Sequence, residues 1–226
     1  MLIAGFPAGS FQTNCYVVAP AAGEECVIVD PGQDAVEGVD ELLREHRLKP
    51  VAVVLTHGHL DHVWSVAPVC GARDVPAWIH PDDRHLLSDP AKGWSPTSAQ
   101  LFGGITLSEP DDVRELADGA DLELAGMSLR VDHTPGHTRG SVTFGLPEAQ
   151  VLFSGDLLFA GSIGRSDLPG GDYPTILRSL ASTMKRLPDE TVVLPGHGPQ
   201  TTIGRERATN PYLAEAAPHA GPARGI

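Results

Sequence analysis

The stretch Thr56-His57-Gly58-His59-Leu60-Asp61-His62 holds three imidazoles and one carboxylate within six consecutive residues. An apolar, β-branched run at residues 51–55 precedes it and predicts a buried strand with the motif in the loop at its carboxyl end. From an extended loop His57 and His59 can point the same way, which they cannot do from one face of a helix. One tetrahedral zinc ion does not take so many ligands from so short a segment. The stretch therefore predicts two metal ions, or one ion with catalytic neighbours; the alternative is a solvated loop or a helix cap.

Composition describes a globular protein with room for one sizeable core. The chain has 226 residues, of which 41% are hydrophobic and 20% charged. Its formal net charge of −13 and the lack of clustered Lys and Arg argue against a nucleic-acid partner. No apolar run approaches the ~18 residues of a membrane span, and no basic segment precedes the apolar first residues. We therefore expect a cytoplasmic protein with neither a membrane nor a nucleic acid as partner.

Three cysteines, Cys15, Cys26 and Cys70, are odd in number and widely spaced, and each lies in or beside an apolar stretch. This pattern predicts buried, reduced thiols rather than disulfides or a metal site.

The chain predicts many short elements. Apolar runs separated by Pro and Gly turns predict strands near residues 2–4, 15–18, 26–29, 75–79, 122–124, 128–132, 141–146, 151–154 and 191–194. Helices are expected over residues 35–47, from about residue 62 with Pro68 ending it early, over 174–187 and over 203–217. Residues 88–118 show little periodicity, which is typical of a lid or substrate-binding segment. We predict one domain over residues 1–226, with residues 219–226 as a frayed tail.

Three further residues could act as metal ligands, because each follows an apolar run in a turn containing Gly or Pro. They are His137, Asp156 and His197. Each alone is equally well explained as a turn residue. Together with the first loop they make five histidines and two aspartates that one scaffold could gather.

In this order along the chain, Thr13-Asn14-Cys15-Tyr16, Asp30-Pro31-Gly32, the histidine motif and the three turns resemble the metallo-β-lactamase superfamily. Within it they are most similar to the glyoxalase II-like hydrolases of the short bacterial type. The resemblance implies an α+β fold, a four-layer αββα sandwich of two mixed sheets with a metal site on one edge. It also implies two divalent ions, zinc with iron or manganese as alternatives. It assigns the first ion to His57, His59 and His137, the second to Asp61, His62 and His197, and a bridging role to Asp156.

Two residues are candidates for binding substrate. Arg165 stands where glyoxalase II enzymes place a glutathione-binding lysine, and its planar fork suits a carboxylate; the alternative is an ion pair with Asp167 or Asp172. Tyr173 either contacts substrate or only precedes a helix. Those enzymes also carry a longer helical domain after the position of His197, which supplies basic residues for the glutathione carboxylates. Only a short tail follows His197 in this sequence, which puts glutathione as the thiol in question.

The other histidines carry weaker expectations. His133 lies close to His137 in sequence and is a candidate to orient it by hydrogen bonding. We expect His80 and His85, which flank an Asp-rich helix start, to be structural or exposed, and His46 and His219 to be solvated.

The resulting hypothesis is hydrolysis of a small-molecule acyl-thiol such as S-lactoylglutathione. Two ions would hold a bridging water and lower its pKa to supply hydroxide, which Asp61 would orient and whose released proton Asp61 would take. The thiol would leave as thiolate without a strong acid. The main alternative is a persulfide dioxygenase with one non-haem iron, followed by lactone or β-lactam hydrolysis. A binding or regulatory protein on a hydrolase scaffold that lost its metals is the remaining class. The sequence predicts no oligomeric state.

Overall fold

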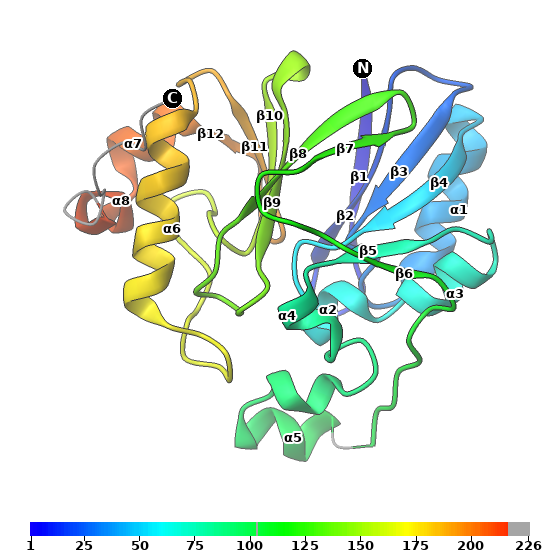
Figure 1. Cartoon of the computed structure of the whole chain (residues 1–226), viewed down its shortest axis with the longest axis horizontal. Helices are drawn as coiled ribbons and strands as arrows, with labels where there is room; N and C mark the ends of the chain where they lie inside the picture. The colour runs from blue at the N-terminus through cyan, green and yellow to red at the C-terminus, as the bar shows by residue number, and fades with distance from the viewer. Residues whose placement is uncertain (103, 217–226) are drawn as a thin grey trace.

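The computed structural model describes residues 1–102 and 104–216, and in it two six-stranded sheets face each other with helices outside both (Figure 1). The first sheet has the order β1-β2-β3-β4-β5-β6. Its strands are Leu2–Ala8, Thr13–Ala19, Glu25–Val29, Lys49–Val54, Ala77–Ile79 and Val113–Glu115. The second sheet has the order β12-β11-β10-β9-β8-β7. In chain order, its strands β7 to β12 are Asp121–Leu124, Met127–His133, Val142–Leu146, Val151–Gly155, Val192–Pro195 and Thr201–Thr202.

Eight short α-helices and two 3-10 turns, η1 and η2, complete the described chain. The helices α1 to α8 are Ala35–His46, Leu60–Val63, Val66–Gly71, Pro81–Arg84, Pro96–Phe102, Tyr173–Arg186, Ile203–Thr209 and Pro211–Ala216. The 3-10 turns are Pro90–Gly93 and Pro147–Ala149. In Figure 1, α1 and α3 lie outside the first sheet, and α6, α7 and α8 lie outside the second. The predicted αββα sandwich is thus confirmed.

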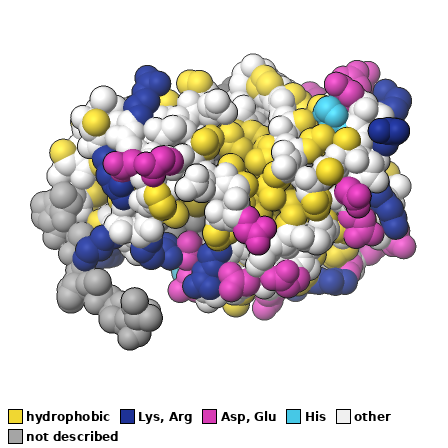
Figure 2. All heavy atoms as spheres, turned by 90° about the horizontal axis from the view of Figure 1, so that it is seen from above, with side chains coloured by type: hydrophobic (Ala, Val, Ile, Leu, Met, Phe, Trp, Pro, Cys, Tyr) yellow, Lys and Arg dark blue, Asp and Glu magenta, His cyan; other side chains and the backbone are white. Residues whose placement is uncertain are grey.

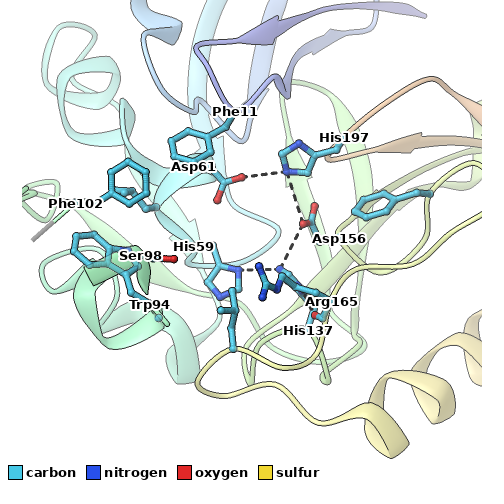
Figure 3. Close-up of a pocket in the computed structure, with 14 residues that line it drawn as sticks. Phe11, His59, Asp61, Trp94, Ser98, Phe102, His137, Asp156, Arg165 and His197 are labelled. Atoms are coloured by element: carbon cyan, nitrogen blue, oxygen red, sulfur yellow. Dashed lines mark hydrogen bonds and ion pairs between the residues drawn. The ribbon is translucent and has the colours of Figure 1, made fainter. Parts of the chain in front are cut away.

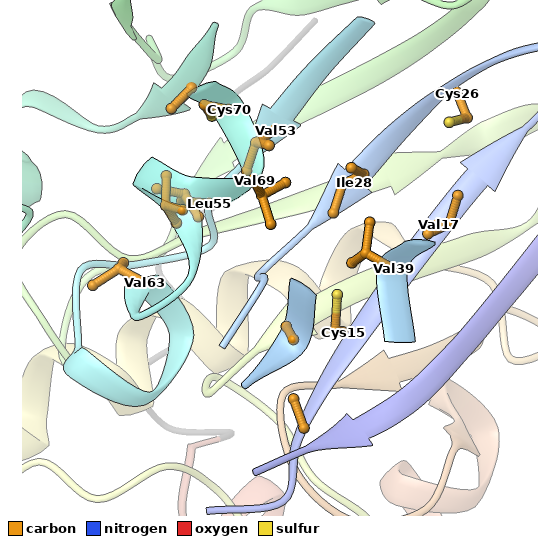
Figure 4. Close-up of a cluster of buried hydrophobic side chains, with 14 of the residues drawn as sticks. Cys15, Val17, Cys26, Ile28, Val39, Val53, Leu55, Val63, Val69 and Cys70 are labelled. Atoms are coloured by element: carbon orange, nitrogen blue, oxygen red, sulfur yellow. The ribbon is translucent and has the colours of Figure 1, made fainter. Parts of the chain in front are cut away.

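Alternation along the strands divides the interior into three apolar layers. In β3, Cys26 and Ile28 face the outer helices of the first sheet (Figure 4), while Val27 and Val29 face the second sheet. In β10, Phe153 faces the first sheet and Leu152 faces α6. Because successive side chains of a strand point to opposite faces, strands covered on both sides read as unbroken apolar runs.

All three cysteines are free and buried, as predicted. Burial raises the pKa of the thiols of Cys26 and Cys70 to about 12 and that of Cys15 further still.

Strand direction brings the carboxyl ends of three strands of the second sheet to one edge. Both β8 and β10 are antiparallel to β9, and β10 is parallel to β11, so β8, β10 and β11 run in the same direction. The turns that follow them carry His137, Asp156 and His197. The histidine motif follows β4 in the facing sheet.

Backbone hydrogen bonds join the two sheets at this edge. The Val142 N–H donates to the Thr56 carbonyl at 2.8 Å, and the Asn14 N–H donates to the Gly196 carbonyl at 2.7 Å. The Asn14 side chain and the Tyr16 hydroxyl also donate to the Pro195 carbonyl, at 3.0 and 2.8 Å. The loop of the first sheet and the turns of the second are thus held at one place.

Two helix predictions were wrong. The helix from residue 62 does not end at Pro68: it is divided at Trp64 and Ser65 into α2 and α3, and Pro68 lies in the first turn of α3, where its missing N–H has no helical partner. The expected helix over 203–217 is two helices, because Asn210 precedes Pro211 and takes an extended conformation. Residue 217, His219 and the predicted frayed tail lie outside the described residues.

Residues 88–118 contain η1, α5 and β6, none of which the sequence pattern indicated.

None of the described helices is both long and apolar enough to cross a membrane. On the face drawn in Figure 2, hydrophobic side chains gather in the middle, and Lys and Arg are interspersed with Asp and Glu around them.

Candidate metal centre

Three imidazoles converge from the two sheets. His137 Nε2 lies 3.1 Å from His57 Nε2 and 2.8 Å from His59 Nδ1. All three rings are buried. These nitrogens are close enough to act as ligands of one ion.

A second group lies beside the first. His197 Nε2 lies 3.1 Å from Asp61 Oδ2, and His62 Nε2 lies 3.4 Å from the same oxygen. The ligand atoms of Asp61, His62 and His197 are also close enough to one another to hold one ion. The Thr13 hydroxyl donates to Asp61 Oδ2 at 3.1 Å and so fixes the carboxylate from the neighbouring strand β2.

Asp156 lies between the two groups and faces both. Its Oδ1 is 3.4 Å from His62 Nε2, and its Oδ2 is 3.5 Å from His137 Nε2 and 3.8 Å from His197 Nε2. The structure therefore brings together all seven residues that the sequence nominated, which we call the ligand cluster: His57, His59, Asp61, His62, His137, Asp156 and His197.

The outward nitrogens of three rings have hydrogen-bond partners outside the cluster, which leaves the Nε2 atom of each ring facing into it. His62 Nδ1 lies 3.0 Å from Asp30 Oδ2, and His137 Nδ1 lies 2.7 Å from the Arg165 carbonyl oxygen. A carboxylate and a carbonyl only accept, so these rings donate from Nδ1 and direct Nε2 inward. The Thr56 hydroxyl donates to Asp30 Oδ2 at 2.6 Å, and its oxygen can accept from His57 Nδ1 at 3.1 Å.

Three buried atoms of the cluster have no hydrogen-bond partner in the described part of the chain. They are His59 Nε2, His62 Nε2 and Asp156 Oδ1. Buried polar atoms without partners are rare in folded proteins and need an explanation. Neutral imidazoles with carboxylates are also the donor set that zinc and other divalent transition metals prefer. The residues present therefore fit bound divalent cations.

Electrostatics of the cluster agree with this fit. Burial and the neighbouring imidazoles lower the pKa of His57, and lower that of His59 to about 3, so both rings are in the neutral form that binds metal. Burial raises the pKa of Asp61 and of Asp156, but His62 and the other rings outweigh it and hold both pKa values below the usual range. Burial likewise opposes charge on His62, yet the two carboxylates raise its pKa well above the ordinary value. The two carboxylates therefore favour a positive charge beside His62 Nε2, and a bound divalent cation would supply it.

Asp30 is an anchor that the sequence analysis named only as part of the Asp30-Pro31-Gly32 motif. Its buried carboxylate accepts from the Thr56 N–H at 2.8 Å, from the Thr56 hydroxyl and from His62. It therefore fixes the first residue of the histidine motif and one of its rings. The one available signal was an acid placed directly after a buried strand.

Asp83, in α4, is a second missed anchor. Its buried carboxylate accepts from the Gly58 N–H at 2.9 Å, from the Thr138 hydroxyl at 2.6 Å and from the Gly140 N–H at 2.8 Å. Gly58 belongs to the histidine motif, whereas Thr138 and Gly140 belong to the turn that carries His137. One carboxylate thus joins the two loops, and no pattern in the sequence indicates this contact.

Gly196 shows how tightly the cluster is packed. A Cβ at this position would lie 2.3 Å from Asp156 Oδ1 and 2.7 Å from His62 Cε1. Such distances are far inside van der Waals contact, so a side chain here would displace two residues of the cluster.

The ligand cluster opens into a cavity of about 370 Å³. Figure 3 shows Phe11, Phe102 and Trp94 on one side of His59 and Asp61, with Arg165 on the other side. Gly93, Trp94, Ser98 and Phe102 come from the segment 88–118, which the sequence predicted to bind or cover substrate.

The two candidate substrate residues differ in position. Arg165 lines the cavity, but its guanidinium forms the alternative ion pair, with Nε 2.7 Å from Asp167 Oδ1 and Nη2 2.8 Å from Oδ2. Tyr173 is not among the described residues of the cavity wall; its hydroxyl donates to Glu215 at 2.8 Å, and it begins α6. This geometry fits the alternative in which Tyr173 only marks the start of a helix, and it gives no support to a contact with substrate.

The prediction that His133 orients His137 does not match the observed bonds. His133 Nε2 donates to the Arg139 carbonyl at 2.8 Å, and its ring stacks on His80 with centroids 4.1 Å apart. Together with Asp82 these two rings form a separate group outside the cavity. The Arg165 carbonyl, not His133, orients His137.

His85 is exposed, as the sequence analysis anticipated, and His46, which was expected to be solvated, is partly exposed.

Comparison with known proteins decides the family. The family model described as "Metallo-beta-lactamase superfamily" matches residues 8–197. The chain belongs to this superfamily. Its members are mostly metal-dependent hydrolases, and the buried His and Asp groups described above are of the kind that binds metal.

Two relatives cover nearly the whole chain. An uncharacterized protein of Mycobacterium tuberculosis is 50% identical over 219 residues, covering 94% of this chain and 98% of the relative. The protein named hydroxyacylglutathione hydrolase GloC of Haemophilus influenzae is 36% identical over 210 residues, covering 92% of this chain and 95% of the relative.

Two solved structures share the fold closely. The B3 metallo-beta-lactamase BLEG-1 has a TM-score of 0.84 at 42% identity, covering 94% of this chain and 99% of its own. TTHA1623, solved in a di-iron-bound form, has a TM-score of 0.79 at 41% identity, covering 93% of this chain and 100% of its own.

Proposed function

We propose that this member of the superfamily is a hydrolase of small acyl-thiols that works with two divalent metal ions. The first ion would be held by His57, His59 and His137, and the second by Asp61, His62 and His197. The observation that carries the proposal is the position of Asp156, whose two carboxylate oxygens face the two groups separately. A carboxylate placed in this way is suited to bridge two ions. The di-iron form of TTHA1623 supports the count of two and supports iron as an alternative to zinc.

Ions held there would supply Lewis-acid chemistry, activating water at neutral pH and polarising the substrate carbonyl. The chain's own contribution centres on Asp61, which lines the cavity and stays ionised because His62 and His197 hold its pKa low. An ionised carboxylate accepts hydrogen bonds, so Asp61 orients the attacking water in front of the carbonyl carbon. Thr13 and His197 fix its direction.

A thioester is favoured by what the cavity wall lacks. A thiol has a pKa of about 8.5 and leaves as thiolate, whereas an amine leaving group needs a proton donor. Among the described residues of the wall there is no Lys, Tyr, Cys or Glu, and every histidine belongs to the ligand cluster. This chemistry supports the thioester over the β-lactam, which releases an amine, and the similarity to GloC points the same way.

The test combines metal content with turnover. Elemental analysis of purified protein should give close to two ions per chain, and the same protein should hydrolyse S-lactoylglutathione or a simple acetyl thioester. Asp156→Ala should lower turnover by roughly 100-fold or more with the fold intact, because both groups lose a carboxylate. Asp112→Ala, which removes an exposed acid paired with its neighbour Arg114, is the matched control.

Two results would overturn the proposal. A folded, metal-loaded protein that turns over no thioester would exclude the hydrolase. One iron per chain with oxygen uptake on a persulfide would instead identify a dioxygenase.

A further inference from the structure

One side of the cavity is built from aromatic rings. Phe11 comes from the turn between β1 and β2, Trp94 follows η1, and Phe102 is the last residue of α5. The centroids of Phe11 and Phe102 are 5.6 Å apart, and those of Trp94 and Phe102 are 6.0 Å apart. The three rings therefore form one apolar surface beside His59 and Asp61 (Figure 3), which we call the aromatic wall.

These rings are only half-buried, so they offer apolar area that a ligand can cover. Their centroid separations lie within the 4.5–7 Å range in which aromatic rings contact one another favourably. A ring or branched chain placed against them would gain both area burial and ring contacts. A cavity of about 370 Å³ is large enough for a small molecule.

Charge in the cavity is unevenly distributed. Arg165 is the one Lys or Arg among the described residues of the wall, and Asp167 already binds one edge of its guanidinium, through Nε and Nη2. It lies on the side of the ligand cluster opposite the aromatic wall (Figure 3). A substrate with two carboxylates would find one paired cation on that side and none beside the rings.

We propose that the aromatic wall is a binding subsite for an apolar, uncharged acyl group, either aromatic or branched aliphatic. The inference rests on the proposed thioester hydrolysis. The scissile carbonyl must lie at the ligand cluster, so one arm of a bound thioester points to the rings and the other to Arg165. The polar thiol arm takes the side with the cation, which leaves the acyl arm against Phe11, Trp94 and Phe102.

The test varies only the acyl group. The values of kcat/KM are measured for the acetyl and phenylacetyl thioesters of one neutral thiol, N-acetylcysteamine, with the metal-loaded enzyme. We expect a preference of about 10-fold or more for phenylacetyl. Phe102→Ala and Phe11→Ala should lower kcat/KM for phenylacetyl by roughly 5- to 20-fold, mainly through KM, and change the acetyl value by less than about 2-fold. Tyr173→Ala removes an aromatic ring outside the cavity and should change neither value.

A binding titration makes the subsite testable apart from the reaction. Phenylacetamide, a neutral probe that is not hydrolysed as a thioester, should bind wild type and Tyr173→Ala alike and bind Phe102→Ala at least about 5-fold more weakly. Equal kcat/KM for both thioesters, or an equal fall for both in Phe102→Ala, would overturn the subsite and leave thioester hydrolysis standing. If neither thioester is hydrolysed but phenylacetamide binding still depends on Phe102, the proposed function fails and the subsite stands. No binding of phenylacetamide would overturn the subsite.

Discussion

The ligand cluster and the aromatic wall share one cavity but are held in place in opposite ways. Each residue of the cluster lies in a segment that follows a strand, and the buried carboxylates of Asp30 and Asp83 fasten the loops that carry five of the seven. Phe11, Trp94 and Phe102 come from a turn, the end of a 3-10 turn and a short helix, and they contact each other mainly through their rings. The difference teaches that the sheets position the reactive groups, while short loop elements shape the space for the substrate. Such loops can vary in sequence without moving the cluster.

Among substitutions outside the ligand cluster, Asp30→Asn should disturb the cluster most. An amide presents a donor where Thr56 and His62 both need an acceptor, so two buried hydrogen bonds lose their partner. We expect metal affinity and turnover to fall roughly 10- to 100-fold, because His62 loses the group that fixes its orientation. Metal titration and kcat measure this directly. Asp34→Asn changes an exposed acid in the same loop and should leave both unchanged; unaltered metal affinity in Asp30→Asn would show that the cluster does not depend on this anchor.

Asp83→Ala tests the link between the two ligand loops. The substitution leaves Gly58, Thr138 and Gly140 without their common acceptor inside the protein. We expect the free energy of unfolding to fall by about 2–4 kcal/mol, with a smaller loss of activity than for Asp30→Asn. The hydrogen bonds to the Asp83 carboxylate come from Gly58, Thr138 and Gly140, and none comes from a described ring of the cluster. Chemical denaturation gives the value, and Asp82→Ala, its exposed neighbour, is the control. Loss of all metal binding at unchanged stability would contradict this division of roles.

The same contrast explains what the sequence could predict. Period-two apolar runs and strand-end turns are local patterns, and they were sufficient to nominate ten of the twelve described β strands, all but β6 and β12, and all seven residues of the cluster. Asp83 could not be found in this way, because it acts through contacts with residues 25 and 55 to 57 positions away in the chain. The aromatic wall could not be found either. Its three rings lie in segments with no shared period, and only the fold brings Phe11 to Phe102.

The buried cysteines of the core should make the stability of the protein fall at alkaline pH. Burial raises the pKa of Cys26 and Cys70 from 9.0 to about 12 in the folded protein. The unfolded chain therefore loses these protons first, so stability should be fully present below about pH 9 and decline as pH rises towards 12. Thermal unfolding across this range measures the decline. At pH 8 the native thiols should resist a disulfide reagent and react only after denaturation; rapid labelling of the native protein would contradict the burial.

Substitutions of Arg165 and Asp167 should have the smallest effect on KM, and they test the side of the cavity opposite the aromatic wall. Both side chains are largely exposed, so their ion pair contributes little to stability, and Arg165→Gln should leave the melting temperature nearly unchanged. If Arg165 meets a carboxylate of the thiol arm, Arg165→Gln should raise KM about 2- to 5-fold for a thiol that carries one carboxylate, and leave KM for N-acetylcysteamine thioesters unchanged. Asp167→Asn should act in the opposite direction, because it frees the guanidinium from its present partner. Equal KM changes on charged and neutral thiols would mean that the pair only shapes the loop whose carbonyl holds His137.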